Sequence, residues 1–276
     1  MTEQQVVVGV DGSLVAVRAL DWAADEAARR AAELRVVYAV PDCDEAAPVL
    51  AEAAARVGER HPGLPVDTRA VRGGAVKALA RESEDAALTV VGTRGFGAVG
   101  SLLAGSVSLR LAAHVRSPLL VVRGDHPCDE GRRVLLGLES DADADAAAYA
   151  FREAERRGVR LDVLHSRIHR HTTPELPSLV PATSPGQERE AQDDRAEEAV
   201  PRFSLARLQA EHPEVGVEAR TVRTGPAHAL LEATREAAVV VIGVHRRTRL
   251  GPHLGPVVHT LLHRSHCPVA LVPTAG

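Results

Sequence analysis

Short apolar runs alternate with longer amphipathic segments in the first half of the chain. The apolar runs have the length of strands and occupy residues 6–10, 35–40, 66–71, 88–92 and 119–122. The segments between them carry apolar residues at intervals of three or four positions, which is typical of helices with one buried face. Strands that alternate with helices predict right-handed crossovers and a doubly wound parallel sheet.

The first helix is predicted to begin directly after the first strand. Ser13 is placed to cap it, and a buried stripe would include Leu14, Val17, Leu20 and Ala24.

The second half of the chain repeats the landmarks of the first. Three pairs of segments match, at residues 5–13 and 133–141, 87–94 and 238–245, and 117–123 and 267–273. The polar, turn-rich residues 124–131 lie between the two copies. We therefore expect two α/β domains in tandem, at 1–124 and 132–276. Residues 167–200 in the second are rich in Pro, Ser, Glu and Asp without an apolar period, and are expected to form a partly disordered surface insertion.

Composition and charge exclude several classes of protein. The formal net charge is −4 and the pI is near 6.4, so no basic surface for nucleic acid is expected. The apolar runs are far shorter than the ~20 residues that span a bilayer, and Met1 is followed by polar residues where a secretion signal would be basic and then apolar. We expect a cytoplasmic protein that does not enter a membrane.

Cysteine and histidine usage predicts neither disulfides nor a metal site. The three cysteines, Cys43, Cys128 and Cys267, are far apart and form no Cys-x-x-Cys pair. Two histidine sets have spacings that a metal could use, but no supporting residues can be identified for either, so no metal is expected. The sets are His165, His169 and His171, and His259, His263 and His266 with Cys267.

The candidate ligand site lies where a doubly wound sheet binds its ligands, beyond the carboxyl ends of the strands. Gly-Val-Asp-Gly-Ser at residues 9–13 follows the first strand, and a glycine-rich run over 92–106 follows the fourth. Its glycines, Gly92 among them, allow positive φ and a close approach to a ligand, and Ser106 opens a helix whose free N–H groups favour an anion. Asp11 can accept from ribose hydroxyls or help to hold a phosphate-bound Mg²⁺. The alternative is that the glycines form only a flexible loop and Asp11 only caps a helix.

The glycine-rich run is neither of two common nucleotide motifs. A Walker A loop needs Gly-Lys-Ser/Thr, but the only lysine of the chain, Lys77, follows Val76. The dinucleotide fingerprint should follow the first strand, where the sequence is Gly-Val-Asp-Gly.

Gly92, Gly95, Gly105 and Ser106 fit the pattern Gly-x₂-Gly-x₉-Gly-Ser/Thr, by which the sequence resembles the ATP-binding branch of the universal stress protein family. The resemblance implies two flavodoxin-like (Rossmann-like) five-stranded sheets, ATP with Mg²⁺ at the ends of strands one and four, the end of strand two near the adenine, and dimers formed through the last strands. The residues expected to contact the nucleotide are Gly9, Val10, Asp11, Gly12, Ser13, Val40, Gly92, Thr93, Arg94, Gly95, Phe96, Gly97, Gly105, Ser106, Val107 and Ser108.

The second half departs from this pattern where phosphate would bind. Arg246 replaces the second glycine, one residue is missing from the loop, and Pro256 replaces the hydroxyl residue, which removes a hydroxyl and an N–H together. Glu139 replaces Asp11. Arg246, Arg247 and Arg249 could still bind an anion through their side chains, so another ligand mode stays open.

Three functions remain open. The first is an ATP-binding regulatory module of the stress response that is not an enzyme. The second is an adenine-nucleotide hydrolase or transferase, for which Asp11 is the only candidate base. The third is a ligand-free dimerisation scaffold. The last strands, 119–122 and 270–272, have apolar edges that we expect to pair, either within one chain or across a homodimer.

Overall fold

The computed structural model describes residues 5–41, 43–93, 106–123, 132–166, 205–245 and 254–274. The predicted insertion at 167–200 and the predicted boundary at 124–131 lie outside these residues. The described part of the N-terminal half consists of β1 (Gln5–Val10), α1 (Leu14–Arg30), β2 (Glu33–Val40), α2 (Ala47–Arg60), β3 (Val66–Arg72), α3 (Ala75–Glu82), β4 (Leu88–Gly92), α4 (Ser106–His114) and β5 (Leu119–Val122). The described part of the C-terminal half includes β6 (Arg133–Leu138), α5 (Ala144–Arg157), β7 (Leu161–Ser166), β8 (Val217–Val222), α7 (Pro226–Ala233), β9 (Ala237–His245), α8 (Pro256–Arg264) and β10 (Val269–Thr274), and residues 205–211 are helical as well.

The five strands predicted from the apolar runs are confirmed, each to within two residues. Ser13 caps α1 as predicted, with its side chain accepting from the N–H of Ala16. The predicted buried stripe is partly wrong, because the buried face is centred on Ala16, Ala19 and Ala23. Leu14 lies two positions before Ala16, about 200° around the helix, and is 79% exposed. None of the described helices is long and apolar enough to cross a membrane.

The described strands form one ten-stranded sheet in the order β3-β2-β1-β4-β5-β10-β9-β6-β7-β8. Every neighbouring pair is parallel except β5 with β10. Within each half the order is 3-2-1-4-5, which is that of the Rossmann fold, whereas the flavodoxin order begins 2-1-3. The α/β class with parallel, Rossmann-like halves is thus confirmed.

The two halves share one sheet because their last strands pair within the chain. Leu120 lies opposite Ala270 in the antiparallel register of β5 and β10. Each of these strands would otherwise present an open apolar edge. The structure therefore has the first of the two pairings expected from the sequence.

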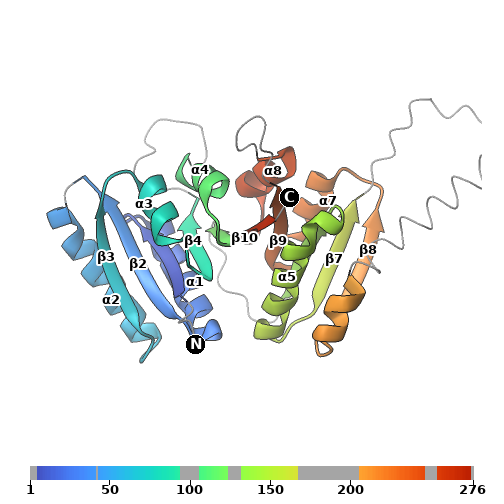
Figure 1. Ribbon diagram of the computed structural model, residues 1–276, viewed down its shortest axis with the longest axis horizontal. Helices are drawn as coiled ribbons and strands as arrows, with labels where there is room; N and C mark the ends of the chain where they lie inside the picture. Colours follow the sequence, from blue (N-terminus) through green and yellow to red (C-terminus); the bar gives the residue numbers. More distant parts are fainter. Residues whose placement is uncertain are drawn as a thin grey trace, which may run out of the picture.

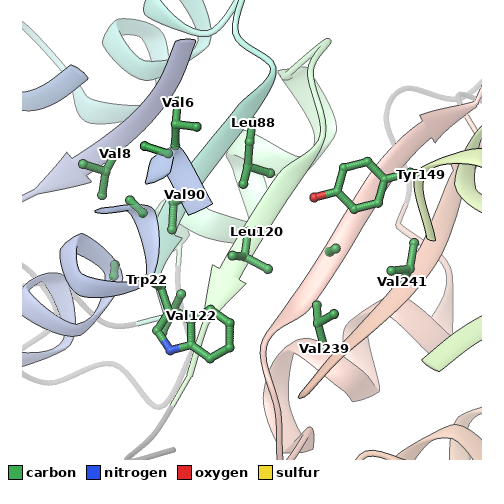
Figure 2. Packing of buried hydrophobic residues seen from close by; sticks show 14 of the residues in the cluster. Val6, Val8, Trp22, Leu88, Val90, Leu120, Val122, Tyr149, Val239 and Val241 are labelled. Atoms are coloured by element: carbon green, nitrogen blue, oxygen red, sulfur yellow. The ribbon is translucent and has the colours of Figure 1, made fainter. Parts of the chain in front are cut away.

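Helices cover both faces of the sheet (Figure 1), and the core is continuous across its middle. Apolar residues of α1, α2 and α5 join one buried cluster, and those of α3, α4, α7 and α8 join the cluster on the other face. Figure 2 shows the first cluster passing from Leu120 and Val122 of β5 to Val239 and Val241 of β9. The two halves thus bury apolar surface against each other as well as pairing strands.

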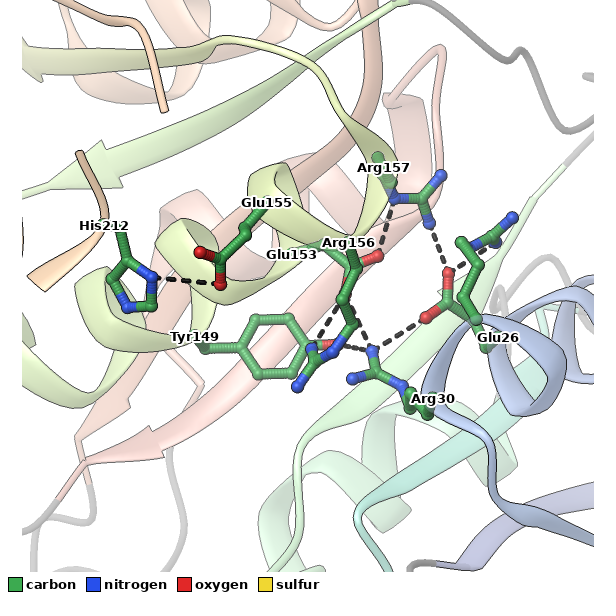
Figure 3. A network of polar contacts seen from close by, with 9 residues as sticks. Glu26, Arg30, Tyr149, Glu153, Glu155, Arg156, Arg157 and His212 are labelled. Carbon is green, nitrogen blue, oxygen red and sulfur yellow. Dashed lines mark hydrogen bonds and ion pairs between the residues drawn. The ribbon is translucent and has the colours of Figure 1, made fainter. Parts of the chain in front are cut away.

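A ring of buried charges joins α1 to α5 (Figure 3). The guanidinium of Arg30 donates to Glu26 at 2.7 Å and to Glu153 at 2.8 Å. Arg157 donates to Glu153 at 2.6 Å and also pairs with Glu26. All four side chains are at most 8% exposed. Burial alone would raise the pKa of Glu26, but Arg157, Arg30 and Arg29 outweigh it and lower that pKa from 4.5 to about 2.

Candidate functional site

The N-terminal half has a cavity of about 100 Å³ at the carboxyl ends of β1, β2 and β4. This is the switch point, since β1 lies between β2 and β4 and the helices after β1 and β4 cover opposite faces. The predicted contact residues that line the cavity are Gly9, Val10, Asp11, Gly92 and Val107. The structure therefore brings together the end of β1, the end of β4 and the first turn of α4.

Asp11 stands in the cavity wall and also shapes the turn that leads into α1. Its Oδ1 accepts from the backbone N–H of Ser13 at 3.1 Å and from the Ser13 hydroxyl at 2.6 Å. Gly12, between them, has φ +77°, which side chains rarely tolerate. Asp11 therefore does not cap α1 itself but holds Ser13, the residue that does, and these two bonds fix the Asp11 carboxylate at the cavity.

Two glycines of the site lie where a side chain would crowd a neighbouring helix. A Cβ at Gly9 would lie 2.8 Å from Leu79 of α3, and a Cβ at Gly92 would lie 2.7 Å from Val15 of α1. The expectation that Gly92 adopts a positive φ is wrong, because it ends β4 with another backbone conformation. Its lack of a side chain lets α1 approach the strand ends closely.

The cavity lining does not include five of the described predicted contacts, which are Gly12, Ser13, Val40, Thr93 and Ser108. Thr93 and Ser108 are buried, and the N–H of Thr93 donates to the carbonyl of Val122 at 3.0 Å. The Val40 side chain packs into the cluster under α1 and α2, on the opposite face of the sheet. From β2 the cavity is lined by Val37 and Ala39, which alternation along the strand could have indicated.

The glycine-rich loop itself is only partly described. Arg94, Gly95, Phe96, Gly97 and Gly105 lie outside the described residues. Ser106 begins α4, but its side chain is outside them too. The loop contacts stay a prediction.

The C-terminal half has a cavity of about 660 Å³ at the equivalent place, the carboxyl ends of β6, β7 and β9. Glu139, at the position of Asp11, lines it together with Gly255 and Pro256 at the start of α8. Apolar side chains from five elements form most of the wall, among them Leu138, Leu164, Leu230, Ile242, Val244 and Val257.

The Asp143 side chain binds the turn after β6, which borders this second cavity. Its Oδ2 accepts from the N–H of Glu139 at 2.7 Å and from that of Ser140 at 3.3 Å. Its Oδ1 lies 3.0 Å from Nε2 of His245, whose Nδ1 is 2.8 Å from the Thr274 hydroxyl. The Asp143 side chain is 4% exposed, so the protein itself places a buried carboxylate at the strand ends.

Sequence reasoning missed Asp143, although the internal repeat contains the signal. Extending the match of 5–13 with 133–141 by two positions aligns Asp143 with Val15. An acidic residue at the position of an apolar valine indicates that the turns after the first strand differ chemically between the two halves. Within the part of the chain that the structure describes, no three His, Cys, Asp or Glu side chains are grouped as a metal would need.

Comparison with known proteins gives consistent results over the whole chain. The sequence profile described as "Universal stress protein family" matches residues 3–60, 42–123 and 131–273. A universal stress protein of Mycolicibacterium smegmatis is 34% identical in an alignment that covers 98% of this chain and 97% of that protein. The crystal structure of a universal stress protein from Archaeoglobus fulgidus has a TM-score of 0.67, with 18% identity and all of both chains covered. A universal stress protein solved in complex with cAMP is 28% identical and covers 44% of this chain and 98% of its own, with a TM-score of 0.38.

Proposed function

The chain belongs to the universal stress protein family, and we propose that its N-terminal half binds ATP. We further propose that the protein is a nucleotide-dependent regulatory module of the stress response and not an enzyme. The observation that carries the proposal is the meeting of three predicted elements at one cavity. Asp11 at the end of β1, Gly92 at the end of β4 and Val107 in the first turn of α4 all line it.

The residues of this cavity fit the chemistry of an adenine nucleotide. Val37, Leu79 and Val91 provide an apolar wall of the kind that a flat base packs against. Asp11 is the carboxylate that would accept from ribose hydroxyls or help to hold Mg²⁺. α4 begins beside the same cavity, and the N-terminus of a helix favours phosphate.

The second half is proposed to leave ATP unbound. Asp143 already uses the N–H groups of Glu139 and Ser140, so a phosphate approaching this turn would meet a carboxylate at close range. Like charges at such distances repel each other strongly in a partly desolvated cavity. Together with Pro256 at the start of α8, this favours one nucleotide per chain.

Calorimetric titration of the full chain with ATP and Mg²⁺ tests the proposal. Asp11→Ala should weaken binding by roughly tenfold to a hundredfold, since a hydrogen bond to a charged group contributes about 1.5–3 kcal/mol. Asp11→Asn keeps an acceptor for Ser13 and separates loss of charge from loss of the turn. Glu139→Ala, the matched change in the other half, should leave affinity unchanged.

Other outcomes support the other functions. Equal affinity of the Asp11 and Glu139 variants would refute the site. A parallel phosphate-release assay should find negligible turnover, and rapid multiple turnover would favour the hydrolase. Absence of binding by the wild-type chain would favour the ligand-free scaffold.

A further inference from the structure

The second cavity has the size of a small-molecule site, although the Asp143 carboxylate already occupies two N–H groups of its strand-end turn. Its volume of about 660 Å³ lies within the roughly 300–1,000 Å³ of typical ligand pockets. Three of its wall residues, Leu138, Leu230 and Ile242, are at most 5% exposed and belong to the cores on the two faces of the sheet. The wall is therefore preformed and mostly apolar.

The two carboxylates that line this cavity differ in how well the protein compensates their charge. Among its described lining residues the ionisable ones are Glu139, Asp143 and His245. Asp143 is bonded to His245 and to two backbone N–H groups, so its charge is compensated within the protein. Glu139 is exposed at the end of β6 and adds a carboxylate to the apolar wall. A ligand with an apolar body and a positive charge complements this arrangement.

We propose that the cavity of the C-terminal half binds a small organic cation, a protonated amine with an apolar body, whose ammonium group lies beside Glu139. Burial of the apolar body supplies most of the affinity, in proportion to the area removed from water. Pairing with an exposed carboxylate adds a smaller amount, equivalent to about twofold to fivefold in affinity. The two halves of the chain thus differ in the class of ligand that they select.

The sequence offers a built-in reporter for this cavity. The chain has two isoleucines, Ile168 and Ile242, and Ile242 lines the cavity. Labelling the isoleucine δ-methyl groups with ¹³C in the full chain therefore gives two signals in a methyl NMR spectrum, which Ile168→Val assigns. Three matched probes differ only in charge: 1-naphthylmethylamine, 1-naphthylmethanol and 1-naphthoate.

The amine should move the Ile242 signal with saturation, at concentrations about twofold to fivefold lower than the alcohol requires, and naphthoate should bind most weakly. Glu139→Gln should abolish the preference for the amine and leave the affinity of the alcohol unchanged. Asp11→Ala, in the other half, should change neither affinity.

Each contrary result overturns a named part of the proposal. An Ile242 signal that no probe moves would mean that the cavity binds no ligand of this kind. Equal affinity of amine and alcohol would refute the selection of a cation. Naphthoate binding at least as tightly as the amine would assign the cavity to anions, the reading that Arg246, Arg247 and Arg249, which lie outside the described residues, leave open.

Discussion

Replacing Glu26 by Gln tests whether buried charges hold the two halves of the chain together. Glu26 is 1% exposed and pairs with Arg29, Arg30 and Arg157, the last from the other half. Its pKa is lowered from 4.5 to about 2, and at 1.36 kcal/mol per unit this corresponds to about 3 kcal/mol of preference for the charged form in the folded protein. Removal of one partner from a buried ion pair costs about 3–5 kcal/mol. We therefore expect Glu26→Gln to lower the free energy of unfolding by about 3 kcal/mol.

The single tryptophan of the chain provides the assay. Trp22 is 3% exposed in α1, and the guanidinium of Arg157 lies over its ring at 5.5 Å from the centroid. Urea unfolding followed by its fluorescence and by circular dichroism measures the loss. Glu211→Gln is the matched control, because Glu211 forms an exposed i,i+4 pair with Arg207 that contributes at most about 0.5 kcal/mol. A difference of less than about 1 kcal/mol between the two variants would refute the structural role of the buried ring.

Three further outcomes are expected. Because the pKa of Glu26 is lower in the folded than in the unfolded protein, its contribution to stability is complete above about pH 4.5 and declines toward pH 2. The difference in stability between wild type and Glu26→Gln, measured from urea midpoints, should therefore be smaller at pH 3 than at pH 6. A difference that does not change with pH would contradict the lowered pKa. Ala31 follows α1 with φ 49° and Gly158 follows α5 with φ 62°, a left-handed backbone that favours glycine. Ala31→Gly should therefore stabilise the chain by about 1 kcal/mol, and Gly158→Ala should destabilise it by a similar amount. Thermal unfolding of the two variants checks that the changes in stability have opposite signs. Ser106→Ala should weaken ATP binding several-fold without changing the melting temperature, and unchanged affinity by calorimetry would remove Ser106 from the phosphate site.

The strands were predictable because their signal is local, whereas the way the halves join was not. An apolar run such as 119–122 indicates a strand by its own composition. The same run leaves open whether its edge pairs within the chain or with a second copy, because both pairings bury the same side chains. The Glu26–Arg157 contact could not be predicted from the sequence either, since Glu26 and Arg30 at i,i+4 have the spacing of an ordinary surface pair.

The candidate site was predictable in position and less so in detail. Asp11 and Gly92 follow strands, so their place at the carboxyl edge of the sheet comes from the fold. Val40 was assigned to the adenine by resemblance, although a side chain at the end of a strand can face either side of the sheet. Asp143 was missed, although comparison of the two copies places it at the position of Val15, and its burial and its partners, backbone N–H groups and His245, come only from the structure.

The most direct test of the account is the number of nucleotides that one chain holds. Native mass spectrometry of the full chain, titrated with ATP and Mg²⁺, counts bound nucleotides at each concentration. We predict a plateau at one ATP per chain that Asp11→Ala removes and Glu139→Ala retains. A second ATP bound with similar affinity would contradict it, because the turn occupied by Asp143 would then accept phosphate after all.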